Sequence, residues 1–111
     1  AAGLFEAPFY RDLRQALRED GMVIAQTESP FSDASVVTGA FDALRRVFPV
    51  ARLCWGAMPT YPTGMWTYTV GSSSYDPSVP VRSCPPGTRY YTPDVHRAAF
   101  ALPAFLSELI R

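Results

Sequence analysis

The chain has 111 residues, of which 48% are hydrophobic and 18% charged, a balance typical of a globular domain and too apolar for a disordered segment. Ten basic and ten acidic side chains cancel, with no stretch that concentrates one sign, which excludes a nucleic-acid partner read through bulk charge. One histidine and two distant cysteines are too few for a zinc site, and no apolar run approaches the roughly 18 residues that span a bilayer. We therefore expect a cytoplasmic protein without metal or membrane partner.

The first two predicted elements are a helix and a strand. Apolar side chains recur at every fourth position between residues 4 and 20, a pattern typical of an amphipathic helix. We expect Gly21 to end this helix, because glycine adopts the left-handed cap conformation without steric cost. The continuous apolar run at residues 22–26 then predicts a strand covered on both faces.

The middle of the chain predicts a second helix followed by two strands. Turn and helix-start residues at 29–33 precede apolar side chains at helical spacing, and Pro49 ends that helix. Residues 50–58 and 65–70 are predicted strands, and residues 61–64 form the turn between them.

The last third predicts a loop and two short helices. Residues 71–88 contain four prolines and two glycines, which indicates a loop or mobile flap, and Pro93 and Pro103 mark two helix starts. The alternation of helices and strands predicts an α/β layer structure with about three strands flanked by helices. So small a sheet leaves an edge uncovered, which suggests that further polypeptide precedes it.

Gln26, Tyr61 and Trp66 fall at predicted strand ends, where open α/β sheets bind ligands. Carboxamide and phenol oxygens accept N–H bonds from an ammonium group and aromatic faces attract it, so the three residues suit a cationic amine. They also suit an ordinary hairpin, with packed aromatics and a satisfied polar residue at a strand end. Spacing alone favours this second interpretation.

Three segments carry a resemblance to a known family: VIAQTESP, MPTYPTGMWTYTVGSS and RYYTPDVHRAAFALPAF. In this order and spacing they resemble the C-terminal part of spermidine synthases, which are polyamine aminopropyltransferases. The resemblance implies a Rossmann-like, methyltransferase-type sheet whose last strand inserts antiparallel to its neighbours. It also implies transfer of an aminopropyl group from decarboxylated S-adenosylmethionine to putrescine, giving spermidine and methylthioadenosine.

The resemblance also implies roles for individual residues. Gln26 and Tyr61 align with putrescine-contacting residues, and Tyr61 would assist a catalytic aspartate expected upstream of residue 1. Trp66 aligns with the pocket wall beside the diamine, while Ala1 and Leu4 align with residues near the adenosyl group. Decarboxylated S-adenosylmethionine is then a co-substrate, and no metal or redox cofactor is implied.

Residues 1–111 are accordingly interpreted as one C-terminal segment of the catalytic domain, without the upstream half and the N-terminal β-domain. We expect a homo-oligomeric parent enzyme and negligible activity of the segment alone. His96 is expected to be structural, and Tyr90 and Tyr91 to pack the flap against the last helices. Two alternatives remain: an acceptor such as agmatine, cadaverine or spermidine, and a non-catalytic fold remnant that acts as an interaction or assembly module.

Overall fold

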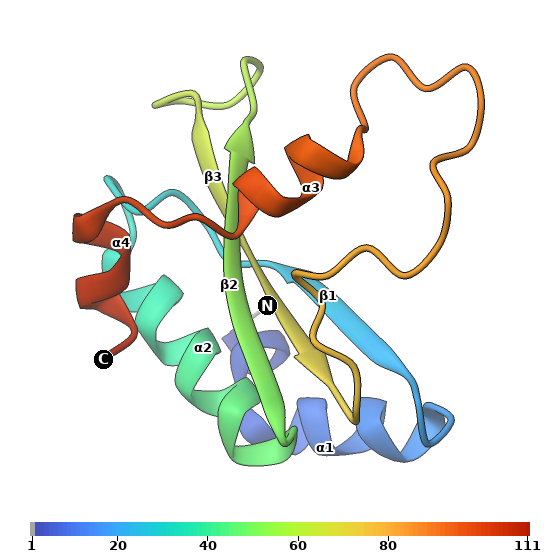
Figure 1. The fold of residues 1–111 in the computed structure, drawn as a ribbon. Coiled ribbons are helices and arrows are strands. Elements are labelled where there is room, and N and C mark those ends of the chain that lie inside the picture. The colour runs from blue at the N-terminus through green and yellow to red at the C-terminus, as the bar shows by residue number, and fades with distance from the viewer. Residues whose placement is uncertain (1) are drawn as a thin grey trace.

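The computed structural model describes residues 2–111. Within this range the helices and strands follow one another in the order η1, a 3₁₀ helix (Ala2–Phe5), α1 (Ala7–Ala16), β1 (Met22–Gln26), α2 (Ala34–Val47), β2 (Val50–Ala57), β3 (Met65–Ser72), α3 (Pro93–Ala99) and α4 (Ala104–Leu109) (Figure 1). β3 extends to Ser72, so residues 71 and 72 of the loop predicted at 71–88 are strand. Residues 73–92 connect β3 to α3 without a helix or strand, and this connection is called the flap from here on.

β3 lies between β1 and β2 and pairs antiparallel with both. Gln26 at the end of β1 is opposite Tyr68, and Ala57 at the end of β2 is opposite Met65. β1 and β2 therefore run parallel to each other, and their carboxyl ends meet at the edge of the sheet where the β2–β3 hairpin turns. The prediction of an antiparallel last strand inserted between its neighbours is confirmed.

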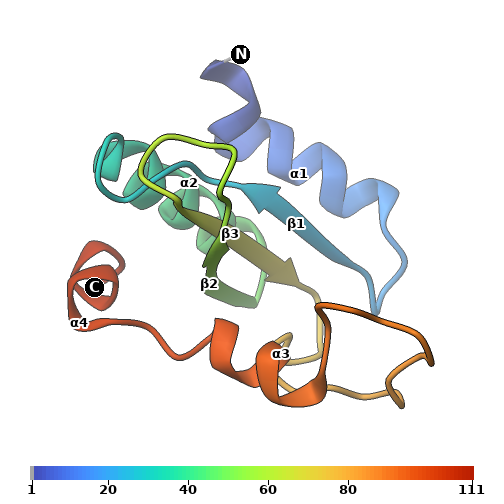
Figure 2. The ribbon, with the colours of Figure 1, turned by 90° about the horizontal axis from the view of Figure 1, so that it is seen from above.

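Helices cover the two faces of the sheet unequally. Figure 2 shows α1 and α2 on one side of the strands and α3 on the other. Apolar side chains from α1, α2 and β1 form one core cluster, centred on Tyr10, Leu44 and Phe48. A second cluster joins α2, β2 and α4 through Phe41, Leu53 and Leu106. We call the opposite side of the sheet the α3 face, and it carries Met22, Ile24, Gln26, Cys54, Tyr68 and Val70.

Two expectations about the start of the chain are wrong. The helix ends at Ala16 rather than at Gly21, because the backbone of Leu17 is extended. The Leu17 N–H still bonds to the Leu13 and Arg14 carbonyls and so completes the last helical turn. Gly21 directly precedes β1 and is not among the described residues with positive φ, so it forms no left-handed cap.

The expectation that β1 is covered on both faces is also wrong. Its side chains alternate between partly buried and exposed, and Ile24 on the α3 face is 63% exposed. A continuous apolar run does not distinguish a strand covered on both sides from one covered on a single side.

The two C-terminal helices are held by specific hydrogen bonds. α3 begins at Pro93, as predicted, and the Thr92 hydroxyl caps it by accepting from the Val95 N–H at 3.0 Å. The Trp55 indole donates to the Ala101 carbonyl at 3.0 Å, which attaches the α3–α4 connection to β2. Pro103 occupies the N-cap position of α4 rather than the first helical position expected for it, so α4 begins at Ala104.

Candidate functional site

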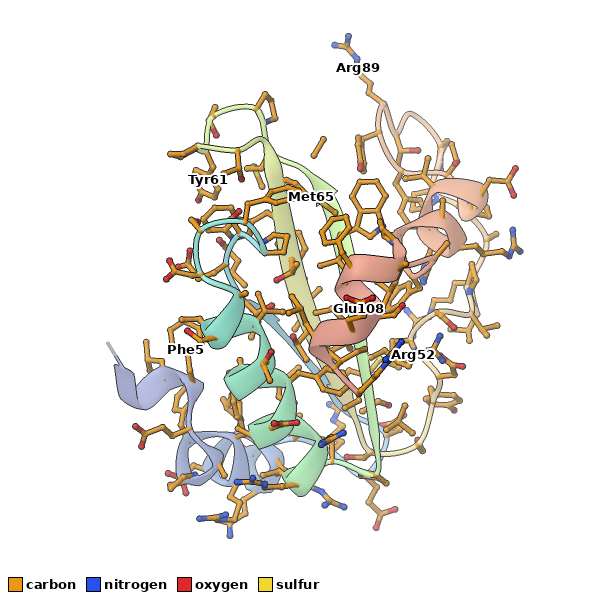
Figure 3. The ribbon with its side chains drawn as sticks, turned by 90° about the vertical axis from the view of Figure 1, so that its left-hand side faces the viewer. Phe5, Arg52, Tyr61, Met65, Arg89 and Glu108 are labelled. Carbon is orange, nitrogen blue, oxygen red and sulfur yellow. The ribbon has the colours of Figure 1, made fainter. Side chains whose placement is uncertain are left out.

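The candidate site lies at the edge of the sheet where β1 and β2 end. The loop between β2 and β3 is closed by three backbone hydrogen bonds, of which the Met58 N–H to Gly64 carbonyl bond is 2.8 Å. Thr63 and Gly64 both have positive φ, so the turn requires the left-handed conformation twice in succession. Tyr61 sits inside this turn, and its position is therefore set by the backbone hydrogen bonds (Figure 3).

Tyr61 and Trp66 pack against each other across the turn. Their ring centroids are 4.4 Å apart with the planes at 52°. The Trp66 indole N–H is buried and has no hydrogen-bond partner among the described residues. Because an indole nitrogen only donates, Trp66 can offer an amine its aromatic face and nothing else.

Gln26 reaches the same edge from β1. It is exposed and directly opposite Tyr68, so the two side chains share the α3 face. Burial raises the pKa of Tyr68, and the neighbouring side chains of Tyr61, Cys54 and Tyr90 raise it further. Tyr68 thus has Gln26 on one side and Tyr61 close by, which brings the two predicted amine-binding residues to one region.

Hydroxyl groups tie the segment after β1 to the hairpin. Ser29 and Thr63 are joined through their hydroxyls at 2.8 Å, which connects the loop after Gln26 to the turn that carries Tyr61. Neither the Gln26 amide nor the Tyr61 hydroxyl makes a hydrogen bond within residues 2–111. Hydrogen bonds therefore fix the two loops to each other, while the polar groups of Gln26 and Tyr61 stay free for a ligand.

A buried threonine network supports the end of β1 from the α2 side. The Thr67 hydroxyl donates to the Glu28 carbonyl at 2.9 Å, and the Thr27 hydroxyl lies 2.8 Å from Thr67 and 3.1 Å from Thr69. Since each hydroxyl has one proton and a carbonyl only accepts, the donors run from Thr69 to Thr27 to Thr67 to Glu28. The network holds Glu28 at a φ of 78°, a conformation uncommon for a residue other than glycine.

Comparisons with known proteins decide the family. Residues 1–83 match the profile of the spermine/spermidine synthase domain. The chain belongs to this family. It is 47% identical over 113 residues to a polyamine aminopropyltransferase of Caldicellulosiruptor bescii, with 100% of this chain and 41% of that protein covered. A polyamine aminopropyltransferase of Bacillus subtilis (strain 168) is 42% identical over 113 residues, with the same coverage.

Solved structures agree with the fold of this spermine/spermidine synthase domain. The spermidine synthase from Thermotoga maritima superposes with a TM-score of 0.86 at 40% identity, covering 99% of this chain and 40% of that one. A spermidine synthase in complex with the transition-state analogue AdoDATO gives 0.85 at 39% identity, covering 97% and 40%. The Rossmann-like, methyltransferase-type fold class is thereby confirmed. The chain spans about 40% of the length of these relatives.

The remaining predicted positions of the spermine/spermidine synthase domain lie elsewhere. Leu4 belongs to η1, which packs against α1 and α2, on the opposite side of the sheet from Gln26 and Tyr68. Ala1 lies outside the described residues. The structure therefore does not bring Leu4 together with Gln26 and Tyr61, and its predicted contact with an adenosyl group stays a prediction.

His96 binds two partners that leave neither ring nitrogen free. Its Nε2 donates to the Pro77 carbonyl at 2.7 Å, which requires the proton on that nitrogen. Its Nδ1 lies 2.8 Å from the Tyr91 hydroxyl, and its ring stacks on Phe100. His96 thus fixes the flap to α3, in agreement with the structural role expected for it.

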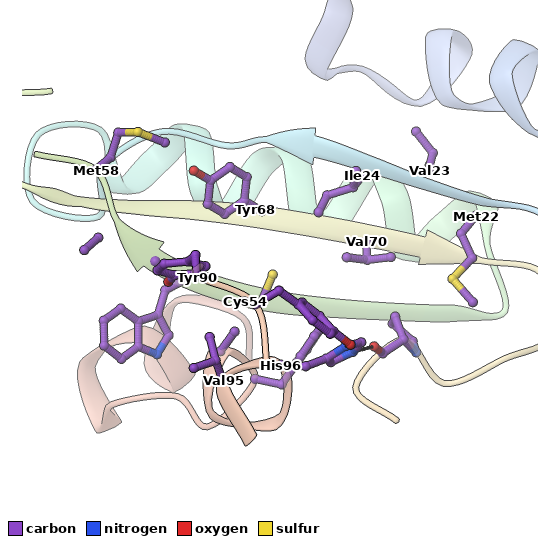
Figure 4. A pocket seen from close by; sticks show the side chains of 17 residues that line it. Met22, Val23, Ile24, Cys54, Met58, Tyr68, Val70, Tyr90, Val95 and His96 are labelled. Carbon is purple, nitrogen blue, oxygen red and sulfur yellow. Dashed lines mark hydrogen bonds between the residues drawn. The ribbon is translucent and has the colours of Figure 1, made fainter. Parts of the chain in front are cut away.

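Sequence reasoning missed Tyr68 and the cavity beneath it. A cavity of about 650 Å³ lies between the α3 face of the sheet and α3 with the flap (Figure 4). The signal for Tyr68 was present, because Trp66 and Tyr68 are two residues apart on one strand and must share a face. Its neighbour Gln26, however, follows only from the register of β1 with β3.

No three histidine, cysteine or carboxylate side chains in the described part of the chain gather in a way that could hold a metal ion. Among the same residues, no helix is long and apolar enough to cross a membrane.

Proposed function

We propose that this chain is part of a polyamine aminopropyltransferase that transfers the aminopropyl group of decarboxylated S-adenosylmethionine to putrescine. The observation that carries the proposal is that Gln26 and Tyr61 lie at one sheet edge, with both polar groups free and their loops joined by the Ser29–Thr63 hydrogen bond. Membership of the spermine/spermidine synthase family supports it.

The reaction needs orientation more than activation. A neutral amine nitrogen of putrescine attacks the aminopropyl carbon bonded to the sulfonium, forming the C–N bond of spermidine. The C–S bond breaks, and its electron pair stays on sulfur to give neutral methylthioadenosine, while the new ammonium releases a proton. Because the sulfonium is already a good leaving group, the displacement requires neither metal nor redox cofactor, and holding the reactants in line supplies most of the rate.

Each site residue has a distinct part in this proposal. The Tyr61 hydroxyl accepts an N–H bond from the attacking amine and fixes its direction, and the Gln26 carboxamide oxygen accepts from an ammonium group. Trp66 presents its ring face to the cationic chain, a contact worth about 0.5–2 kcal/mol depending on desolvation.

The complete enzyme in this proposal contains polypeptide beyond these residues. The relatives are more than twice as long as the part they share with this chain, which supports that view. The additional part would supply the carboxylate that orients the diammonium substrate, the nucleoside site and the contacts of a homo-oligomer. The 111-residue chain alone should then show negligible transfer.

Substitutions in the complete polypeptide test the site. Tyr61→Phe and Gln26→Ala should each lower kcat/KM for putrescine about tenfold or more, because each removes a hydrogen bond to a charged or reacting nitrogen. Two exposed side chains serve as matched controls: Tyr75→Phe in the flap and Gln15→Ala on α1. Both substitutions should leave kcat/KM unchanged. Spermidine and methylthioadenosine are quantified by mass spectrometry, and agmatine, cadaverine and spermidine are offered as competing acceptors. Wild-type rates in both site variants would defeat the assignment.

One observation favours a second function, that of an assembly module. Within the described residues the outer edge of β1 has no strand partner, and the side chain of Ile24, in the middle of this strand, is largely exposed. An unpaired edge strand is a template for pairing with another chain. Light scattering of the purified chain separates the two functions, since a stable monomer would count against the assembly module.

A further inference from the structure

We propose that Tyr68 is a specificity-determining residue, whose ring divides the cavity on the α3 face into a part beside the candidate amine site and an apolar part along β1 and β3, and so excludes acceptors that carry an apolar tail. The proposal rests on the proposed function and adds a selection rule to it.

The position of Tyr68 follows from the strand register. It is directly opposite Gln26 on one side and Cys54 on the other, so it occupies the middle of a row that crosses the sheet. Trp66 lies two residues earlier on β3, about 6.8 Å away along the same face. Trp66 in turn packs on Tyr61 at 4.4 Å. Tyr68 is therefore the next side chain inward from the amine site.

The cavity lies on both sides of Tyr68. Toward the hairpin its lining includes Gly56, Ala57 and Met58, and on the other side of the ring it is formed by the apolar side chains of Met22, Ile24, Val70, Val95 and Phe100. Figure 4 shows the Tyr68 hydroxyl directed toward the end of the sheet where Met58 lies, while Val70 and Met22 lie on the other side of its ring. Its polar end thus faces the amine site, and its ring borders the apolar part of the cavity.

The chemistry of the cavity decides what could enter it. A tyrosine hydroxyl is already protonated at neutral pH, and burial raises the pKa of Tyr68 further, so no phenolate draws a cation inward. An ammonium group without a charged partner is costly to bury, which disfavours a longer polyamine. An alkyl chain carries no such cost, and about 650 Å³ is ample for one. The ligand class that Tyr68 excludes is therefore the N-alkylated diamine.

Removing the Tyr68 ring should let the enzyme bind N-alkylated diamines and prefer them to putrescine. Each methylene moved from water into an apolar site favours binding about fourfold. Tyr68→Val suits the test, because valine is small, apolar and favoured in strands. Tyr68→Phe is the matched control, since it deletes the hydroxyl and keeps the ring.

The experiment compares putrescine, N-butylputrescine and N-hexylputrescine on the complete polypeptide, with circular dichroism to verify folding. Calorimetric titration gives affinities without turnover, and kcat/KM is measured in parallel. In Tyr68→Val the affinity ratio of N-hexylputrescine to putrescine should rise at least tenfold over wild type. In Tyr68→Phe the ratio should stay at the wild-type value. Tyr68→Leu replaces the valine variant if the latter does not fold.

Two results overturn the proposal: equal tail-length dependence in wild type and Tyr68→Val, or a wild-type affinity that already rises with tail length. The second needs no variant. Failure of the proposed function looks different, because wild type would then transfer no aminopropyl group to putrescine, while the titrations would still report whether the ring excludes alkyl tails.

Discussion

Replacing Gly71 with alanine should destabilise the fold, although an added methyl group in a strand usually stabilises it. Gly71 is buried in β3 on the side that faces α2. A Cβ built there would lie 2.5 Å from Cδ2 of Phe48 and 2.9 Å from Cδ2 of Leu44. Ordinary carbon contacts are about 3.5–4.0 Å, so the phenyl ring would have to move by about 1 Å.

The magnitude follows from two opposing effects. Phe48 is 3% exposed and Leu44 fully buried, so neither side chain can swing into solvent. Overpacking a filled core costs about 1–3 kcal/mol. The reduced freedom of the unfolded chain returns about 0.4–1 kcal/mol. The net loss in the free energy of unfolding should be about 1–2 kcal/mol.

Urea unfolding of the two matched glycine variants tests this reasoning. Gly56 lies in the neighbouring strand β2, where an added Cβ would meet only Tyr68 and Tyr90, both at 3.9 Å. Gly56→Ala should therefore be neutral or stabilising by up to about 1 kcal/mol. A Gly71→Ala variant as stable as wild type, or an equal loss in both variants, would refute the steric argument.

Two further changes address buried polar groups. Tyr10→Phe should raise the free energy of unfolding by about 1 kcal/mol, because it removes a buried hydroxyl that has no partner among the described residues. A loss of stability in thermal or urea unfolding would instead require a partner for that hydroxyl. Burial raises the pKa of Cys54 to about 11, so the unfolded chain ionises first as the pH rises and stability falls by about 2 kcal/mol between pH 8 and 10.5. Cys54→Val should lack this part of the pH dependence, and equal slopes in urea titrations of both proteins would contradict it.

Elements with strong local signals were predictable from sequence. The strand at residues 22–26 and the start of α3 at Pro93 occur where expected, because a short apolar run and a proline at the first helical position act locally. The end of α1 was not predictable, since Leu17 continues the helical spacing but adopts an extended conformation. Periodicity reports which side chains face a core and does not report where the backbone leaves the helix.

Part of the candidate site could likewise be predicted from the sequence, and part could not. Tyr61 and Trp66 are close in sequence, and their contact follows from a tight hairpin. The proximity of Gln26 to them depends on β3 lying between the parallel strands, which the family resemblance implied and spacing alone did not. Tyr68 required the pairing register as well, because a shift of one residue would turn its ring to the other face.

The central place of β3 also constrains how the chain assembles. Its hairpin with β2 closes over a short turn, whereas its pairing of Ser72 with Met22 joins distant parts of the sequence. On a growing polypeptide β1 is made first and must wait for a partner that is synthesised third. If β1 and β2 met directly, they would occupy the gap that β3 has to fill. Docking of the finished hairpin onto β1 as a unit would avoid that trap, and hairpins close within microseconds, faster than the chain is synthesised.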